Sequence, residues 1–187
     1  KPILASLEQA WSEQMAPSGF NSPHVLTLDE DVLAQPVKLL DLKSQIASQL
    51  HEIVILAMPA QDVIKIRPYL DISTPTITFS EIHDIAFEND ALKLLNALRF
   101  VDIPFLIASR PNSDHFINAA AALKQKNLLR WFALGADSLQ LVSAISKKNQ
   151  QTLSIDGLSG HYQLSGSGEM VRTLDIARFN HDGIITD

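Results

Sequence analysis

The chain has 187 residues and no cysteine, 46% of its residues are hydrophobic, and 15 basic against 21 acidic side chains give a formal net charge of −6. This length is typical of one domain with its own core, and the hydrophobic content excludes intrinsic disorder. The acidic balance argues against nucleic acid as the main partner, and the lack of cysteine excludes disulfides, thiolate metal sites and a cysteine nucleophile.

Helical and extended patterns alternate through the first half of the chain. In chain order we predict a helix over residues 2–15, a strand at His24–Leu28, an acidic loop at Asp29–Gln35, a helix from Pro36 to Leu50, a strand at Glu52–Met58, a helix over Pro59–Tyr69 and a strand at Thr74–Phe79. The run of six apolar residues at 53–58 is typical of a parallel strand that is buried on both faces. This alternation predicts an α/β fold with a mainly parallel sheet covered by helices.

The second half changes character. Residues Arg99–Ile107 are predicted to be extended and divided by Pro104, and helices are predicted over Ser113–Lys126 and Leu128–Ile145. Gly135 lies inside the last helix, where glycine costs up to about 1 kcal/mol relative to alanine, so we expect close packing or a break there. Turn residues at 165–168 and 180–183 separate strand-like runs, which predicts an antiparallel hairpin in the tail, residues 153–187.

The catalytic motifs that occur are incomplete. His51 and Glu52 lack the second histidine of a zinc-protease helix, and the glycines at 166 and 168 lack the helix that follows a dinucleotide loop. The segment Gly157–Gly160 is one residue short of a nucleophile elbow, and no two of the six histidines have ligand spacing on a helix. We therefore predict that the chain is not an enzyme and has no cofactor and no metal ion.

Residues that follow the predicted strands are the remaining candidates, because an open parallel sheet binds ligands at the carboxyl ends of its strands. The candidate cleft or contact residues are Pro59, Ser80, Glu81, His83 and Asp102. Glu81 or His83 would be the general base of a catalytic site. The interpretation that we favour is structural, with Ser80 capping the next turn and the charges in solvent.

Several stretches, taken in their order and spacing, carry a family resemblance. They are Ile53–Pro59, Val63–Leu70, Leu98–Leu106, Leu129–Asp137 and Ile155–Gly160, followed by Arg172, Leu174, Phe179 and Gly183. Together they resemble the carboxyl-terminal domain of the LppC family, outer-membrane lipoproteins that activate penicillin-binding proteins.

The resemblance implies a type I periplasmic-binding-protein fold, in which two α/β lobes are joined by hinge strands. Residues 1–187 would be the second lobe, a three-layer unit with a mainly parallel sheet and a C-terminal antiparallel hairpin. The hinge crossing would lie near 98–108, and the first lobe would be mostly absent, as would the lipid-bearing amino terminus. The family pattern places a strand before the opening helix, whereas this chain starts at Lys1 within that helix and without a signal peptide. We therefore expect a piece of a longer or processed protein.

The implied role is regulatory. The chain would be a non-catalytic periplasmic regulator of peptidoglycan synthesis, attached to the outer membrane through a lipid anchor, that activates a class A penicillin-binding protein by contact and so serves cell-wall biogenesis and cell shape. One alternative is a periplasmic solute-binding lobe for a small molecule, although Ser80, Glu81 and Asp102 are few and not cationic. Another is a cytoplasmic α/β enzyme of the doubly wound kind.

The absent lobe has a consequence for the helix at Leu128–Ile145. That helix would lose the lobe it usually covers, and an open sheet edge recruits other strands. We therefore expect either self-association of the chain or repacking of this helix onto the chain's own sheet.

Overall fold

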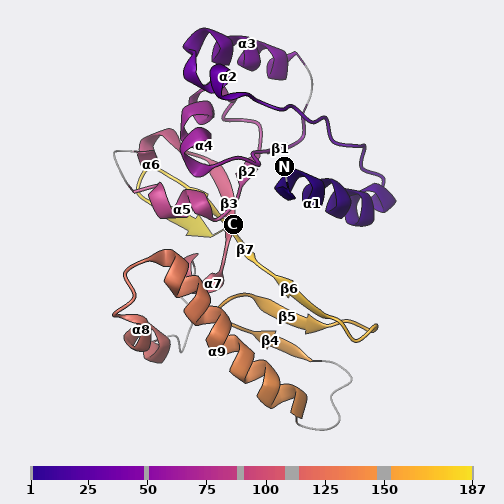
Figure 1. The fold of residues 1–187 in the computed structure, drawn as a ribbon, viewed down its shortest axis with the longest axis vertical. Coiled ribbons are helices and arrows are strands. Elements are labelled where there is room, and N and C mark those ends of the chain that lie inside the picture. The colour runs from indigo at the N-terminus through magenta and orange to yellow at the C-terminus, as the bar shows by residue number, and fades with distance from the viewer. Residues whose placement is uncertain (1, 49–50, 88–90, 108–113, 147–152, 187) are drawn as a thin grey trace.

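The computed structural model describes residues 2–48, 51–87, 91–107, 114–146 and 153–186 and contains two β-sheets (Figure 1). The larger sheet has the order β1-β2-β3-β7-β8, and the smaller has the order β4-β5-β6. The strands are β1 Val54–Ile55, β2 Thr76–Thr78, β3 Leu98–Asp102, β4 Ser154–Asp156, β5 His161–Leu164, β6 Met170–Thr173, β7 Asp175–Phe179 and β8 Ile184–Thr186.

Nine α-helices lie in these described ranges. They are α1 Pro2–Ala10, α2 Glu30–Ala34, α3 Pro36–Ala47, α4 Ala60–Ile66, α5 Glu81–Ile85, α6 Ala91–Leu94, α7 Pro104–Ile107, α8 Asp114–Ala120 and α9 Lys126–Ser146. A π-helical turn at Trp11–Met15 continues α1, and short 3₁₀ turns occupy Ala16–Ser18 and Arg67–Tyr69. No helix among these is long and apolar enough to cross a membrane.

The larger sheet confirms the predicted α/β class. Strands β1, β2 and β3 are parallel, and each is joined to the next through helices on the sheet's faces. Strand β7 then pairs antiparallel with β3, and β8 pairs antiparallel with β7, which forms the predicted C-terminal hairpin. Strands β1 and β2 are shorter than predicted, with two and three paired residues. The predicted burial of the run 53–58 on both faces is wrong, because β1 is at the edge of the sheet and Ile53 and Ile55 are exposed.

The main core lies between this sheet and helices α3, α4 and α5. Strand β3 alternates buried and half-buried residues, so Leu98 and Phe100 point into the core from one face. The ring of Phe100 stacks on that of Phe179 from β7, with centroids 4.6 Å apart. We call this unit, the larger sheet with α2–α6, the five-stranded part.

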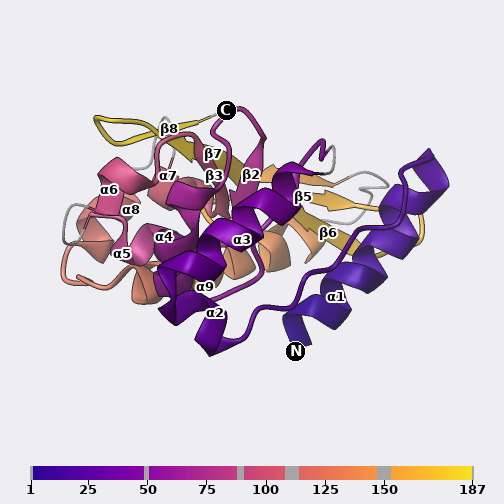
Figure 2. The same ribbon diagram turned by 90° about the horizontal axis from the view of Figure 1, so that it is seen from above.

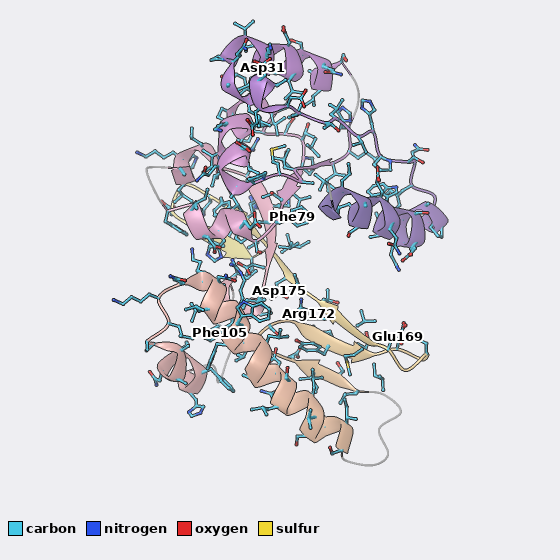
Figure 3. The ribbon with its side chains drawn as sticks, in the orientation of Figure 1. Asp31, Phe79, Phe105, Glu169, Arg172 and Asp175 are labelled. Carbon is cyan, nitrogen blue, oxygen red and sulfur yellow. The ribbon has the colours of Figure 1, made fainter. Side chains whose placement is uncertain are left out.

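A second, smaller unit follows β3 in the chain. It consists of α7, α8, α9 and the sheet β4-β5-β6, all of whose pairings are antiparallel, as predicted for the tail. We call it the three-stranded part. The buried residues Ile103, Ala133 and Leu158 form one cluster of its core, and the rings of Phe105 and Phe132 pack against this cluster. Figure 3 labels Phe105. Strands β3 and β7 connect the two parts (Figure 1).

The hairpin between β5 and β6 has the predicted turn. The backbone N–H of Gly168 donates to the carbonyl of Ser165 at 3.0 Å, and that of Ser165 donates to the carbonyl of Glu169 at 2.8 Å. Glu169 and Arg172 therefore belong to a hairpin that extends away from the crossing strands (Figure 3).

The predicted strand at His24–Leu28 is wrong. Residues 21–29 have no regular structure, and residues 22–28 make no backbone–backbone hydrogen bond within the described part of the chain. The physical reason is the lack of a neighbour, since an apolar alternation becomes a strand only when another strand pairs with it. The opening helix, in contrast, forms as predicted and lies at the periphery of the molecule (Figure 2).

Three further boundaries differ from the prediction. The acidic loop at Asp29–Gln35 contains helix α2. The extended stretch Arg99–Ile107 ends at Asp102, because Pro104 begins helix α7, where a proline at the first position loses no hydrogen bond. The helix expected over Ser113–Lys126 is described only as α8, Asp114–Ala120, and Lys126 instead begins α9.

Gly135 does not have the surroundings that the sequence predicts. Helix α9 passes through Gly135 without a break, and a methyl group added there would meet no atom within 4 Å. The position is exposed. Within the described part of this chain, Gly135 therefore neither packs closely against another element nor breaks the helix.

Candidate functional site

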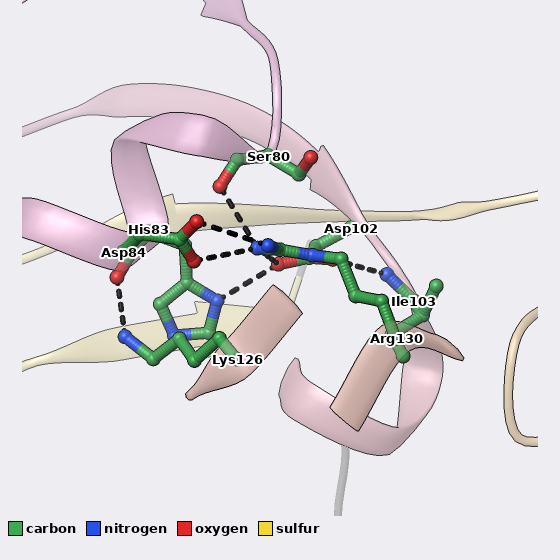
Figure 4. Close-up of polar contacts among 7 residues, drawn as sticks. All are labelled: Ser80, His83, Asp84, Asp102, Ile103, Lys126 and Arg130. Carbon is green, nitrogen blue, oxygen red and sulfur yellow. Dashed lines mark hydrogen bonds and ion pairs between the residues drawn. The ribbon is translucent and has the colours of Figure 1, made fainter. Parts of the chain in front are cut away.

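A buried ionic cluster joins the two parts at the point where β3 leaves the larger sheet (Figure 4). Asp102 is the last residue of β3 and is 1% exposed. Arg130 from α9 donates to it through two nitrogens, with Nε at 2.9 Å from Oδ1 and Nη2 at 2.8 Å from Oδ2. This two-pronged geometry is the strongest arrangement that arginine makes with a carboxylate.

The rest of the Arg130 guanidinium reaches the segment around α5. Its Nη1 donates to Asp84 Oδ2 at 3.0 Å, and its Nη2 donates to the carbonyl of Ser80 at 3.1 Å. Lys126 Nζ, one turn earlier on α9, donates to the carbonyl of His83. Two cations on α9 therefore hold the beginning of this helix against α5 of the five-stranded part (Figure 4).

His83 completes the cluster from the side of the core. It is buried, its ring lies 5.2 Å from that of Phe100, and its Nδ1 is 2.9 Å from Asp102 Oδ2. The backbone N–H of Ile103 donates to Asp102 Oδ1 at 2.8 Å. Both oxygens of Asp102 are thus occupied by donors from α5, from α9 and from Ile103, the residue directly after β3.

Electrostatics keep the Arg130–Asp102 pair ionised. Burial acts to raise the pKa of Asp102, but hydrogen bonds from Arg130 and His83, and then from the Ile103 N–H, outweigh it and lower the pKa below the ordinary value of 3.8. For Arg130, burial acts to lower the pKa, and the hydrogen bonds to Asp102 and Asp84 outweigh it and raise the pKa above the ordinary range. Because Asp102 is an anion, the hydrogen on His83 Nδ1 points to it.

Three of the five candidate residues meet in this cluster. Ser80 contributes its carbonyl, and His83 and Asp102 contribute their side chains. Glu81 is exposed at the start of α5, and Pro59 is exposed directly before α4, so neither belongs to it.

The structural interpretation of these residues needs two corrections. Ser80 precedes α5, but its hydroxyl makes no capping hydrogen bond. Of the polar side chains in this segment, His83 is not in solvent: it is buried, and its Nδ1 lies 2.9 Å from Asp102 Oδ2.

The sequence interpretation missed Arg130. This residue is 28 positions from Asp102, and helical periodicity gives no indication of which cation on α9 turns inward. It lies within the stretch Leu129–Asp137 that carries the family resemblance, and this was the one available signal.

A second buried carboxylate fixes the loop after β4. Asp137, on α9, is fully buried, and its oxygens accept the N–H of Leu158 at 2.8 Å and the N–H and hydroxyl of Ser159, each at 2.6 Å. The Ser159 hydroxyl also lies 2.6 Å from that of Tyr162. With these contacts, Ser159 is a structural residue. Two of the stretches that carry the family resemblance, Leu129–Asp137 and Ile155–Gly160, therefore meet at Asp137.

A third polar group has the order of a hydrolase triad. His161 Nδ1 is 2.6 Å from Asp156 Oδ1, and His161 Nε2 is 3.4 Å from Ser154 Oγ. The Asp156 side chain is 76% exposed, however, so water competes for these hydrogen bonds. A catalytic triad needs dipoles fixed in a site from which water is excluded, and this sheet surface does not provide one. Elsewhere in the described ranges, no group of three or more acidic or histidine side chains is placed to hold a metal ion.

Comparison with known proteins identifies the family to which the sequence is similar. Residues 30–182 match the family described as "LppC putative lipoprotein". No curated protein matches the chain.

Solved structures show the same fold. The LpoA (YraM) C-domain from Haemophilus influenzae, described as a regulator of PBP1A, has a TM-score of 0.71 and 14% identity, over 98% of this chain and 56% of its own. Full-length LpoA from the same organism has a TM-score of 0.60 and 17% identity, over 80% of this chain and 29% of its own. A "putative branched-chain amino acid ABC transporter" from Chromobacterium violaceum has a TM-score of 0.72 and 18% identity, over 96% of this chain and 56% of its own.

At identities of 14–18%, these structures show the fold of the chain but not its function. The chain spans little more than half of the LpoA C-domain. The neighbours confirm the expected periplasmic-binding-protein-like architecture. The family match extends over most of the chain, from α2 to the turn after β7. The chain belongs to the LppC family.

Proposed function

We propose that the chain is a non-catalytic regulator of peptidoglycan synthesis that activates a class A penicillin-binding protein by direct contact. The observation that carries this proposal is the match of 98% of the chain to the C-domain of LpoA, a regulator of PBP1A, together with the family match over residues 30–182. The polar clusters support it, because their groups bind one another rather than converge on an open position.

The cellular location in this proposal follows from the family. An LppC lipoprotein that contacts a peptidoglycan synthase would work in the periplasm, attached to the outer membrane through a lipid at the amino terminus of the full-length protein. The contact with the synthase would then extend across the periplasm. This role serves cell-wall biogenesis and cell shape.

The domain arrangement is part of the same proposal. Residues 1–187 would be the second lobe of a periplasmic-binding-protein fold, with the hinge crossing near residues 98–108, of which residues 98–107 are described. The position of Asp102 supports this view, because its carboxylate binds Arg130 of α9 where β3 leaves the larger sheet. In a regulator, such a bond would hold the two parts in one orientation and present one fixed surface to the synthase.

A solute-binding lobe is the alternative, and its support is the similar fold of the transporter protein from Chromobacterium violaceum. Recognition of an amino acid needs charged groups with free donors and acceptors. Arg130 has a partner on each of its three guanidinium nitrogens, and both oxygens of Asp102 are occupied. The cluster at the crossing therefore favours a structural role over ligand binding.

Binding to the synthase tests the proposal. A purified class A penicillin-binding protein is immobilised, and the 187-residue chain is passed over it at increasing concentration. We expect saturable binding that a monofunctional transpeptidase, used as the control, does not show. No binding to the class A enzyme, together with saturable binding of an amino acid in calorimetry, would replace the regulatory role with solute binding.

A further inference from the structure

The backbone crosses between the five-stranded and three-stranded parts at one end of the larger sheet. Strand β3 ends at Asp102, and the returning chain enters the sheet at Asp175, the first residue of β7. These two residues are partners in the register of the sheet, so the two crossings lie side by side (Figure 1). Residues at the ends of elements absorb the dihedral changes of a domain rotation, and the Asp102–Asp175 pair therefore marks the point about which the two parts can turn.

One set of contacts in the ionic cluster lies at this point of rotation. Arg130 Nε and Nη2 bind Asp102, and the N–H of Ile103, the next residue, donates to the same carboxylate. Helix α7 follows directly, and its Ile107 packs against the main core. Because these groups are close to the crossing, a rotation of the two parts moves them little and leaves the Arg130–Asp102 pair in place.

A second set of contacts lies away from the crossing, on and beside α5. The Arg130 guanidinium also binds both oxygens of Asp84, with Nη1 at 3.0 Å from Oδ2 and Nη2 at 2.9 Å from Oδ1. Lys126 donates to the carbonyl of His83, and its Nζ is 5.3 Å from the centroid of the Phe87 ring. Figure 4 shows both cations reaching from α9 to α5. A rotation that separates α5 from the start of α9 must break all of these contacts.

The two sets differ in their access to solvent. The side chain of Asp84 is 36% exposed, whereas that of Asp102 is 1% exposed. Salt screens an ion pair in contact with water much more than a buried pair. The contact of Arg130 with Asp84 is therefore the one that salt and water can release, while the contact with Asp102 is retained.

We infer that the contacts of Arg130 with Asp84 and of Lys126 with His83 and Phe87 are a salt-sensitive latch, and that the buried Asp102 is the pivot on which the two parts turn when it opens. The latch needs no ligand to close, because α9 itself supplies the cations that join the parts. Closed, it gives the orientation described above, and open, it leaves the parts joined through β3, β7 and the Arg130–Asp102 pair. This inference is independent of the synthase, so its failure would leave the proposed binding to that enzyme untouched.

A distance measurement across the two parts tests the latch. The chain has no cysteine, so Gln45→Cys on α3 and Gln140→Cys on α9, both at exposed positions, carry the only two spin labels in double electron–electron resonance. We expect one narrow distance at about 0.1 M NaCl and a second maximum as NaCl rises to about 1 M, where the screening length falls from about 10 Å to about 3 Å. A single unchanged distance over the whole salt series would overturn the inference.

A charge reversal gives the second arm of the test. Asp84→Lys places a cation against Arg130 and should produce the second maximum already at the lower salt concentration. The matched control is Asp62→Lys, which makes the same change of charge where Asp62 pairs with Lys65 inside α4, and it should keep the single distance. Circular dichroism establishes that each variant is folded, and if Asp84→Lys is not, the salt series decides alone. A folded Asp84→Lys with the original distance, or an equal change in Asp62→Lys, would contradict the latch.

Discussion

Asp102 and Arg130 form a two-pronged ion pair between the end of strand β3 and helix α9, with donor–acceptor distances of 2.9 and 2.8 Å. Strands β3 and β7 connect the five-stranded and three-stranded parts, and this ion pair adds a side-chain contact between them. His83, Asp84 and Ser80 surround it and satisfy the remaining groups. The buried carboxylate of Asp102 is therefore one of the groups that fix the relative orientation of the two parts, together with the contacts of Arg130 and Lys126 to the segment around α5.

Removal of the cation should destabilise the protein strongly. Arg130→Ala leaves the carboxylate of Asp102 buried without its main partner, which is expected to lower the free energy of unfolding by about 3–5 kcal/mol. Denaturant unfolding followed by circular dichroism measures this change. Lys38→Ala is the control, because Lys38 pairs with Asp31 at the surface and such pairs contribute about 0–1 kcal/mol. Equal effects of the two substitutions would show that the buried pair does not stabilise the fold.

Acid should weaken the same pair. The folded pKa of Asp102 is lower than its ordinary value of 3.8, so the contribution of Asp102 is fully present above about pH 4 and is lost as the pH falls through the folded pKa. Unfolding measured between pH 7 and pH 3 should therefore show stability falling at the acid end. In Asp102→Asn this part of the decline should be missing. If the variant and the original chain decline in parallel, the pKa of Asp102 is not lowered by folding.

The loop after β4 predicts a contrast between two glycines. A methyl group on Gly157 would overlap the carboxylate of Asp137, so Gly157→Ala forces that side chain to move and should cost about 1–3 kcal/mol. A methyl group on Gly166, in the β5–β6 turn, would meet nothing within 4 Å, and Gly166→Ala should change stability by less than about 0.5 kcal/mol. Thermal unfolding of both variants checks the contrast, and a neutral Gly157→Ala would mean that the loop is not held as described.

The exposed group of Ser154, His161 and Asp156 should not hydrolyse esters. Because the Asp156 side chain is 76% exposed, its hydrogen bond to His161 does not create the fixed field that activates a serine. We expect the same rate of p-nitrophenyl acetate hydrolysis with the chain and with its Ser154→Ala variant. A large drop in that variant would make the group a catalytic triad.

The larger sheet was predictable where local patterns and tertiary pairing agree. The apolar run before Pro59 forms β1, and the β-branched run at Thr76–Thr78 forms β2. The run at His24–Leu28 has a similar pattern but no strand beside it, and pairing is a property that a single segment does not contain.

The candidate site was predictable only in part, for a related reason. The carboxyl end of a predicted strand identified Ser80 and His83, since strand ends are a local signal. Asp102 was a candidate cleft residue within the expected hinge crossing. Arg130 and Asp137 come from α9, and their inward direction depends on how that helix lies against the two parts. Asp102 is buried because α5 and α9 cover the end of β3, and the sequence does not show this cover.

The most direct test of the regulatory role is the rate of glycan-chain polymerisation by a purified class A penicillin-binding protein, measured on its lipid-linked substrate with increasing amounts of the 187-residue chain. We predict that the rate rises and saturates with the concentration of the chain, and that the chain without the synthase produces no polymer. An unchanged rate at concentrations of the chain that saturate binding would contradict the proposed function.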